Sequence, residues 1–536
     1  MLALPPKEGF SIDTRHVGLD PIAYEYAVSV FGKPIVDRVR EKWHRSVASF
    51  EAIEADIAKF GGATVPSTIR GEATYQAVLQ SVRQQFTSTK KLIPLTLGGA
   101  ALHPDFPKDR SPGLPYTRKG YRTKGDVLND KENMHHLLRL WDAVGRGSQN
   151  VGLPDTCTYF RAQIAPLDKN KIRGVWGYPL DVMVEEFRFL KPYMDWIQQT
   201  DAPIAYRIEM ATGGMSYIND MCTAHPGETL LMVDYSGFDS TIPAWLIRDA
   251  FQILFDSFDF TKVVSSDGQV WPVNPMRTHR RVRKLIQYFI NTPFRLPDGR
   301  RFKKSHGVPS GSGFTNIIDT IINCIVMRFL CFNTTGYLPT ADMYLGDDSF
   351  LITRGIVNID DISAAAKEWF GMTVHPDKSY VTTNSTNVQF LGYFNRSGLP
   401  FKGQEQLIAS FIYPERRVVD NVVRTSRAVG QMWTTLHAAM AYPWHCIVNA
   451  MLQDFNIEPA EVEAYIRHHP GRHRYLRMLG LSIRDVVIPT TIACSVPEVD
   501  PPWRPKRDYI PIRLNIEVLY NQSLLHDNDR YQEKGT

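Results

Sequence analysis

Apolar residues along the chain follow three kinds of spacing, and each spacing predicts a different element. A continuous apolar run over 229–233 is typical of a buried strand. Apolar residues on both sides of Gly346-Asp347-Asp348 predict two short strands joined by a tight turn. Helical spacing predicts helices over 180–199, 314–332 and 361–370. The predicted core face of the first helix consists of Val182, Met183, Phe187, Leu190, Tyr193 and Trp196.

The predicted turn at Gly346 carries two adjacent carboxylates. Glycine adopts backbone angles that other residues resist, and a hairpin tip projects Asp347 and Asp348 away from the sheet. Two neighbouring anions repel each other unless a cation lies between them, and Mg²⁺ prefers such oxygen ligands. A solvated surface turn is the alternative interpretation. A second acidic pair, Asp360-Asp361, precedes helical spacing and is interpreted as a helix start.

A third carboxylate, Asp234, ends the buried apolar run, where a sheet presents polar groups to a crevice. Asp239 follows in the turn toward the next helix, and a helix N-cap is the alternative interpretation for it. Three such carboxylates suit nucleotidyl transfer. Two Mg²⁺ ions bridged by Asp234 and Asp347, with Asp348 assisting, would activate a 3′-hydroxyl and stabilise the leaving pyrophosphate. Mn²⁺ is an alternative ion, because it also accepts carboxylate oxygens.

A small-residue loop containing Ser310 and Gly311 opens directly into the long apolar helix. Thr315, Asp319 and Asn323 lie four residues apart on one face of that helix. Polar groups on an apolar helix need partners. A sugar or a nucleotide backbone would supply them, and the N–H groups of the loop would contact phosphate.

Cations concentrate in three segments. Arg161, Lys171 and Arg173 alternate with apolar or small residues, so a strand here would direct them into one space and bind a triphosphate. Residues 261–304 hold eleven basic residues against two acidic ones, which predicts phosphate-backbone binding, with a solvated helix face as the alternative. In the third segment, rigid turns beside an aromatic ring and cations suit a groove that guides a nucleic-acid strand, and an ordinary surface loop is the alternative. Its candidate residues are Pro112, Gly113, Tyr116, Arg118 and Lys119.

Composition narrows the class of protein. A chain of 536 residues is too long for one compact core, so several lobes are expected. The six cysteines show no close pairing, which favours reduced thiols over a disulfide scaffold or a zinc site. The start of the chain lacks the pattern of a secretory signal. The apolar segment 314–332 contains Asn316, Asp319, Asn323 and Arg328, so we expect a buried helix rather than a membrane span.

In order and spacing, these segments resemble the motifs of viral RNA-dependent RNA polymerases. Motif A is similar to the segment 234–239, motif B to Ser310-Gly311 with Thr315, and motif C to Gly346-Asp347-Asp348. Motif F is similar to the segment from Arg161 to Arg173, and the lysine of motif D to Lys378. Motif E is similar to Phe390-Leu391-Gly392-Tyr393, and motif G to Pro112-Gly113-Leu114-Pro115. The residues around Ser310 and the sequence Gly-Asp-Asp-Ser at motif C look most like those of the enzymes of double-stranded RNA viruses of the picobirnavirus and partitivirus groups.

The resemblance implies a mixed α+β fold, a right-handed polymerase with an antiparallel palm sheet flanked by helices. It implies an N-terminal segment at 1–60 packed on fingers or thumb, fingers at 61–180, palm at 181–257, a fingers insertion at 258–305, palm again at 306–400, thumb at 401–495 and a tail at 496–536. We expect the tail to pack across the lobes or enter the cavity, because its aromatic residues are costly to leave in water.

The resemblance also implies roles for individual residues and for partners. Asp239 would sense the ribose 2′-hydroxyl, and Lys378 would protonate pyrophosphate. Many relatives have Asn where this chain has Asp319, which leaves open whether Asp319 or Asn323 positions the ribose. The implied partners are template RNA, nascent RNA, ribonucleoside triphosphates and viral capsid protein, for a monomeric enzyme without a membrane, in the virion interior and host cytoplasm.

Three other functions share part of this pattern. A reverse transcriptase has the paired aspartates, but usually carries a bulky aromatic group in place of Asp239. A non-enzymatic RNA-binding capsid or packaging protein would account for the basic segments. A metal-dependent nuclease would use the same carboxylates, but would degrade a template without nucleoside triphosphates.

Overall fold

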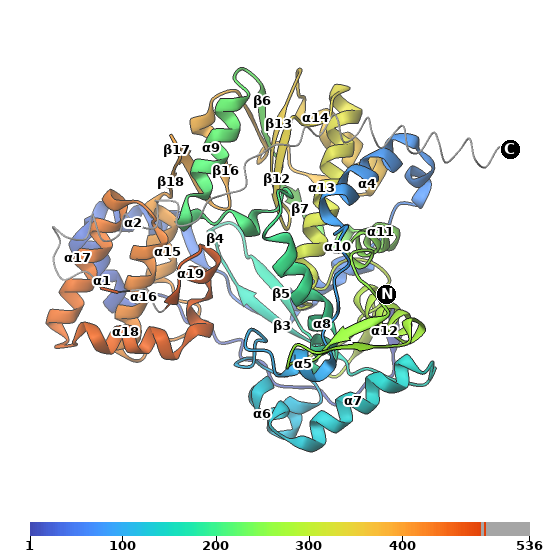
Figure 1. The fold of residues 1–536 in the computed structure, drawn as a ribbon. Coiled ribbons are helices and arrows are strands. Elements are labelled where there is room, and N and C mark those ends of the chain that lie inside the picture. The colour runs from blue at the N-terminus through green and yellow to red at the C-terminus, as the bar shows by residue number, and fades with distance from the viewer. Residues whose placement is uncertain (484–486, 489–536) are drawn as a thin grey trace.

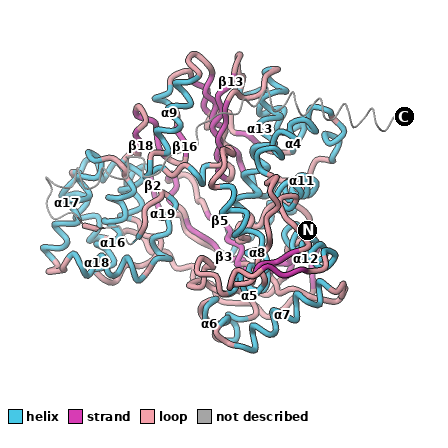
Figure 2. Tube along the Cα trace, viewed as in Figure 1, coloured by secondary structure: helices cyan, strands magenta, loops and turns pink. Residues whose placement is uncertain are grey.

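A computed structural model describes residues 1–483, 487 and 488 (Figure 1). The predicted tail at 496–536 lies outside the described residues. The strands of two sheets run through the middle of the molecule and helices surround them, as Figure 2 shows. The C-terminal helices form a lobe at one side of these sheets. Helices α5 (Leu97–Ala101), α6 (Lys124–Leu128) and α7 (Lys131–Gly145) form the lower edge in the view of Figure 1.

The central sheet has four strands, all antiparallel, in the order β12, β13, β6 and β15. Their bounds are Ala341–Leu345, Asp348–Thr353, Thr229–Met232 and Tyr380–Thr382. The strands predicted from the run at 229–233 and from the two sides of Gly346 are therefore confirmed.

Side chains alternate between two separate cores on the two faces of this sheet. Leu231 and Leu351, which are cross-strand partners, pack in the core that also contains helix α13 (Thr315–Thr335). Leu230 and its partner Ile352 belong to the other core, shared with helix α9 (Gly214–Ala224) and the C-terminal helices. Because successive residues of a strand face opposite sides, a sheet covered on both faces requires the unbroken apolar run that the sequence shows.

Helix α13 is the main core helix. It is long and apolar enough to span a membrane by composition, but 83% of its most apolar stretch is buried inside the protein, as expected for a core helix. Arg328 of α13 is fully buried and forms an ion pair with Asp342 of β12, with Nε to Oδ2 at 2.8 Å. The same guanidinium donates hydrogen bonds to Ser81 and Gln85 of α4 (Ala73–Phe86). This buried network connects the core helix to the strand that leads into the Asp-Asp turn.

Helix α8 (Leu180–Ile197) has a different core face from the predicted one. Val182 and Tyr193 are buried as predicted, but Met183, Phe187, Leu190 and Trp196 are only half-buried. The buried face instead includes Glu185, Glu186 and Phe189. A hydrophobicity pattern assigns carboxylates to the surface, and these two are buried because arginine and loop groups from distant segments reach them.

The second sheet has five strands in the order β1, β11, β10, β3 and β5. Their bounds are Leu2–Leu4, Arg301–Lys303, Pro293–Arg295, Thr156–Ala162 and Ile172–Gly177. The single strand predicted from Arg161 to Arg173 is wrong, because β3 and β5 are antiparallel neighbours and place Arg161 opposite Arg173. The residues between them include β4 (Ile164–Pro166), which pairs with β2 (Trp43–Arg45).

The N-terminal segment contacts two lobes. Strand β1 extends the five-stranded sheet, whereas α1 (Pro21–Phe31) and α2 (Lys33–Lys42) pack against the C-terminal helices. The C-terminal lobe contains α15 (Gln404–Ile412), α16 (Asn421–Thr434), α17 (Ala438–Asp454), α18 (Pro459–His468) and α19 (Arg474–Met478). The predicted domain boundaries remain predictions.

Most cations of the basic stretch at 261–304 are engaged within the protein. Arg281 pairs with buried Glu185, with Nη2 to Oε2 at 2.6 Å, and Arg295 and Arg301 both pair with buried Asp155. Buried Lys304 donates hydrogen bonds to three backbone carbonyls. The prediction that this stretch as a whole binds phosphate is therefore corrected: much of its charge stabilises the fold.

Further helices and strands surround these sheets. They are α3 (Phe50–Ala58), α6 (Lys124–Leu128), α7 (Lys131–Gly145), α10 (Phe238–Thr241), α11 (Ala244–Phe255), α12 (Pro275–Ile290), α14 (Ile359–Phe370), β7 (Tyr235–Ser236), β14 (Thr373–Val374), and a three-stranded sheet of β16 (Gln389–Phe390), β17 (Tyr393–Arg396) and β18 (Leu399–Phe401). Asp360 and Asp361 lie in the first turn of α14, as predicted. The five cysteines of the described residues are free thiols.

Candidate active site

The Asp-Asp pair lies on the predicted hairpin. Leu345 of β12 pairs with Asp348 of β13, so Gly346 and Asp347 form a two-residue turn. Gly346 has φ +59°, in the left-handed region that glycine adopts without steric cost. Asp347 and Asp348 are exposed at the tip. This geometry confirms the turn.

Two polar side chains of helix α13 form hydrogen bonds with the backbone of the turn. The Thr320 hydroxyl accepts a hydrogen bond from the Gly346 N–H at 2.8 Å. The Asn323 amide donates to the carbonyls of Gly346 and Asp348 at 3.0 and 3.1 Å, and its oxygen accepts from the Tyr235 hydroxyl at 3.0 Å. Asn323 is fully buried. The prediction that Asn323 contacts the nucleotide is therefore wrong, because its amide is occupied in supporting the hairpin.

Replacing Asn323 with leucine is expected to destabilise the protein by about 2 kcal/mol, because two carbonyls and one buried hydroxyl lose a hydrogen-bond partner. Urea unfolding of the variant and the parent measures the difference. Equal unfolding midpoints would mean that these bonds do not support the turn.

Asp234 lies next to the hairpin, two residues after the end of β6. Its backbone is held on both sides by the turn before β15: the His375 N–H donates to the Asp234 carbonyl at 2.9 Å, and the Asp234 N–H donates to the Ser379 hydroxyl at 3.0 Å. The side chain of Asp234 is left exposed. Lys378 lies in the same turn and is also exposed. The turn therefore fixes the backbone of one predicted ligand and presents the predicted proton donor beside it.

The three carboxylates interact electrostatically across the end of the sheet. Surrounding protein atoms desolvate Asp348, and the charges of Asp347 and Asp234 act in the same direction, which raises the pKa of Asp348 to about 7. Desolvation also raises the pKa of Asp347, against the opposing effect of Arg173. Within the described residues no three metal-binding side chains are close enough to form a preassembled site. The donor set of three carboxylates fits a hard divalent cation, which would relieve their repulsion.

Two cations face these carboxylates: Arg173 of β5 and Lys171, which directly precedes that strand. Lys171 and Arg173 are exposed, and the positive charge of each lowers the pKa of Asp347. Desolvation and the neighbouring charges of Arg173 and Lys378 lower the pKa of Lys171. Arg161, opposite Arg173 in the sheet, forms an ion pair with Glu415 in the C-terminal part of the chain, with Nη2 to Oε2 at 3.2 Å. Lys171 and Arg173 are thus brought to the carboxylates, whereas Arg161 bridges two lobes.

The small-residue loop before α13 packs against this cationic sheet. The Ser310 hydroxyl accepts a hydrogen bond from the Trp176 N–H of β5 at 3.4 Å. A Cβ on Gly311 would lie 1.6 Å from the Trp176 carbonyl oxygen, so only glycine fits there. The Thr315 hydroxyl donates to the Pro309 carbonyl. The loop therefore lies between the cations of β5 and the polar face of α13.

Asp239 and Asp319 face each other beside the Asp-Asp turn. Asp239 lies inside the short helix α10, whose N-cap is Gly237, so the N-cap interpretation of Asp239 is wrong. Asp319 is 6% exposed, and its Oδ1 is buried without a hydrogen-bond partner in the described part of the chain. Desolvation and the charge of Asp239 raise the pKa of Asp319 well above its ordinary value. Desolvation raises the pKa of Asp239 as well, so burial opposes a negative charge on both carboxyls at once.

The segment predicted to guide RNA is only partly on the surface. Pro112 and Gly113 are buried, and so is Tyr116, whose hydroxyl donates to Asp181 at 2.6 Å. The prediction that these three residues contact RNA is corrected, because they support the loop from inside. Arg118 and Lys119 are exposed, although Arg118 forms an ion pair with Glu8.

Sequence reasoning missed a group of arginines shared by two lobes. Desolvation lowers the pKa of Arg474, and the neighbouring charges of half-buried Arg110 and exposed Arg477 lower this pKa further. Asp109 lies beside them and opposes the effect. No local signal identifies such a group, because Arg110 lies more than 300 residues from the other two arginines in the chain.

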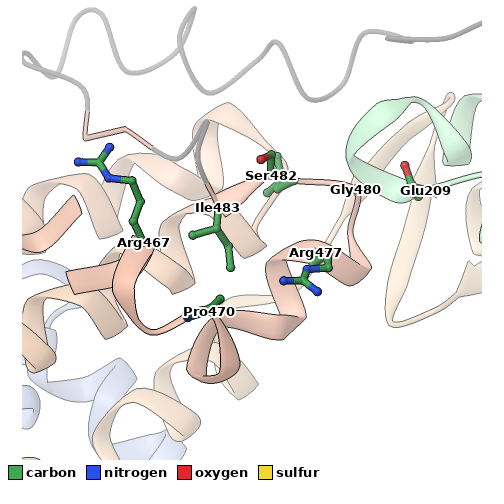
Figure 3. A pocket seen from close by; sticks show the side chains of 8 residues that line it. Glu209, Arg467, Pro470, Arg477, Gly480, Ser482 and Ile483 are labelled. Atoms are coloured by element: carbon green, nitrogen blue, oxygen red, sulfur yellow. The ribbon is translucent and has the colours of Figure 1, made fainter. Parts of the chain in front are cut away.

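A separate pocket of about 590 Å³ lies between the C-terminal helices and Glu209, as Figure 3 shows. Arg467, Arg477, Ser482 and Ile483 are among its lining residues. None of the predicted catalytic carboxylates lines it. The pocket is therefore distinct from the site at the hairpin.

Comparisons with known proteins agree with this arrangement. The family described as viral RNA-dependent RNA polymerase matches residues 22–427. The RNA-directed RNA polymerase of Cryptosporidium parvum virus 1 is 29% identical over 61% of this chain and 62% of its own length, and that of Atkinsonella hypoxylon virus is 24% identical over 66% and 59%. The chain thus matches about three fifths of the length of these relatives.

A solved structure shares the fold over nearly the whole chain. The insertion-loop deletion mutant of a human picobirnavirus RNA-dependent RNA polymerase has a TM-score of 0.60 at 14% identity, covering 90% of this chain and 92% of that one. The fold is therefore the mixed α+β fold of a right-handed polymerase, as predicted. Because the family pattern covers most of its length, the chain belongs to the viral RNA-dependent RNA polymerase family.

Proposed function

We propose that this protein synthesises RNA on an RNA template by nucleotidyl transfer from ribonucleoside triphosphates. One observation carries the proposal: Asp234, Asp347 and Asp348 lie together at the end of the central sheet and face the cations Lys171 and Arg173. The carboxylates suit metal-assisted chemistry at a 3′-hydroxyl, and the cations suit the triphosphate of the incoming nucleotide.

Asp234, Asp347 and Asp348 would hold two Mg²⁺ ions, with Mn²⁺ as a possible substitute. When bound, the ions supply activation of the attacking hydroxyl and stabilisation of the pyrophosphate. The side chains of the chain itself do the rest. Lys171 and Arg173 neutralise the triphosphate, and Lys378, in the turn that holds the Asp234 backbone, is positioned to protonate the leaving pyrophosphate.

Asp239, oriented by Asp319, would read the ribose 2′-hydroxyl. The sequence left open whether Asp319 or Asn323 has this role. Asp319 lies beside Asp239, whereas Asn323 is bonded to the hairpin, and this supports Asp319. A carboxyl that keeps its proton donates a hydrogen bond as an amide does. Asp319 therefore does here what asparagine would do in the relatives.

Replacing Asp239 with alanine is expected to lower the preference for ribonucleotides over deoxyribonucleotides by about tenfold to a hundredfold, because the group that bonds the 2′-hydroxyl is lost. Asp319→Asn is the matched control and is expected to keep the preference within about threefold, since its amide still donates to Asp239. Competing incorporation of labelled GTP and dGTP measures the ratio. An unchanged ratio in Asp239→Ala would remove Asp239 from sugar selection.

The proposed partners are template RNA, nascent RNA and viral capsid protein, with a monomeric enzyme acting in the virion interior and host cytoplasm. Exposed Arg118 and Lys119, together with Arg110, Arg474 and Arg477, are the candidate contacts for the RNA backbone.

Incorporation of labelled ribonucleotides on a defined RNA template, with and without Mg²⁺, tests the proposal. Elongation that requires both the template and the ion supports it. Preference for deoxyribonucleotides would indicate a reverse transcriptase, and loss of template without nucleotides would indicate a nuclease.

A further inference from the structure

Glu186 is a buried carboxyl that the proposed chemistry does not use. It lies on α8 and is 2% exposed. Its neighbour Glu185 is bonded to the guanidinium groups of Arg188 and Arg281. The bonds of Glu186 are instead to the loop before α13: one oxygen accepts from the Gly313 N–H at 3.0 Å, and the other is bonded to the Ser312 hydroxyl. A buried carboxyl whose bonds go to a loop rather than to a cation holds that loop in place.

The opposite side of the same loop is fixed by β5. The Ser310 hydroxyl accepts from the Trp176 N–H, and Gly311 lies against the Trp176 carbonyl with no space for a Cβ. The loop 309–313 is therefore held between the backbone of β5 on one side and the Glu186 carboxyl on the other. Because β5 carries Arg173, this contact also sets the distance between the loop and this arginine, which is proposed to bind the triphosphate.

Glu186 also acts on the start of α13. The Ser312 hydroxyl that contacts Glu186 accepts a hydrogen bond from the Phe314 N–H at 3.1 Å, directly before the first residue of the helix. Further along that helix lie Asp319 and Thr320, which contact Asp239 and the Asp-Asp turn. A displacement of the loop would therefore shift the helix that carries the predicted ribose contact.

The chemistry of this bond permits an uncharged replacement. Burial raises the pKa of Glu186 to about 8, although the bonds from Ser312 and Gly313 oppose this rise. A neutral carboxyl keeps both bonds, because the serine hydroxyl is both a donor and an acceptor. A glutamine amide makes the same two bonds with one N–H and one oxygen. Alanine makes neither, and leaves the Gly313 N–H and the Ser312 hydroxyl without these partners.

We propose that Glu186 is a positioning residue that holds the loop 309–313 in the conformation that receives the incoming nucleotide. Its bonds to Ser312 and Gly313 fix the loop against β5 and orient the first turn of α13. The inference rests on the proposed polymerase function.

Three variants test this role: Glu186→Ala, Glu186→Gln and, as a control on the same helix, Val184→Ala, which removes buried apolar volume but no hydrogen bond. Hydrogen exchange of the loop amides is measured without substrate, and KM and kcat for ribonucleotides are measured on an RNA template. In Glu186→Ala we expect roughly tenfold faster exchange at Gly313 and roughly tenfold higher KM, with kcat changed less than threefold. Glu186→Gln is expected to restore both values.

The control separates positioning from general stability. Val184→Ala is expected to lower the melting temperature and to leave Gly313 exchange and KM unchanged. Unchanged Gly313 exchange in Glu186→Ala would overturn the proposal, and so would an equal rise of KM in Val184→Ala. If the parent protein incorporates no nucleotide at all, the polymerase function fails and the role in nucleotide binding fails with it, whereas the exchange measurement still decides whether Glu186 holds the loop.

Discussion

Replacing Asp347 with asparagine is expected to lower nucleotide incorporation about a thousandfold. Asp347 lies at the tip of the hairpin, where it faces Asp234, Lys171 and Arg173. Its neutral isostere keeps the shape of the turn but removes the negative charge that a divalent cation needs. A thousandfold loss corresponds to about 4 kcal/mol of transition-state stabilisation, which is the scale of metal-ion catalysis. Primer-extension or de novo synthesis assays on a defined RNA template measure the loss.

The chain contains a matched control for this substitution in its other acidic pair. Asp361 is exposed in the first turn of α14, where a negative charge favours the start of a helix, and it lies apart from the three carboxylates in the chain. Asp361→Asn is expected to keep activity within about twofold, because a surface charge near a helix end contributes little. If Asp347→Asn retained more than a tenth of parental activity, the assignment of the hairpin as the catalytic centre would be wrong.

Replacing Arg328 with methionine is expected to destabilise the protein by about 3 to 5 kcal/mol. The substitution leaves the Asp342 carboxylate buried at the start of the hairpin strand without its cation, and a buried charge without a partner is costly. Ser81 and Gln85 also lose their donor, so α4 and β12 are no longer connected through α13. Urea or thermal unfolding of the variant and the parent measures the loss.

Two further variants show whether the loss comes from the unpaired charge. The double variant Arg328→Met with Asp342→Leu is expected to recover part of the stability, because it removes the charge together with its partner. Arg15→Met breaks an ion pair with Asp13 that is fully on the surface, and we expect no measurable change there. If Arg328→Met alone unfolded at the parental midpoint, the buried pair would not stabilise the core.

Several parts of the site followed from local sequence, for reasons that the structure makes plain. The turn at Gly346 was predictable because apolar strands on both sides fix a hairpin and only a few residues remain for its tip. Asp234 was predictable because a buried strand ends just before it. The polar line on α13 was also visible from spacing alone, but spacing did not distinguish between partners: Asn323 bonds to the hairpin, and Asp319 lies beside Asp239.

The errors share one physical origin. Glu185 and Glu186 were not part of the predicted core face, and Arg281, Arg295 and Lys304 were expected to bind phosphate, because in sequence a charged side chain indicates solvent or a charged ligand. Each of them is instead paired or hydrogen-bonded to a group more than ten residues away in the chain. The strand predicted across 161–173 failed because β3 and β5 alternate in the same way as one strand would.

The sequence by itself determined the strands and helices that carry the three carboxylates, and the family to which their order belongs, because strand and helix periodicity and turn residues are local properties. Only the tertiary structure decided which polar groups meet. It brought Lys171 and Arg173 to the Asp-Asp turn, set Asp319 against Asp239, and placed Glu186 under the loop before α13. Pairing between distant segments depends on how the sheets and helices pack. Whether a buried charge stabilises or destabilises the protein depends on the partner that the packing brings to it.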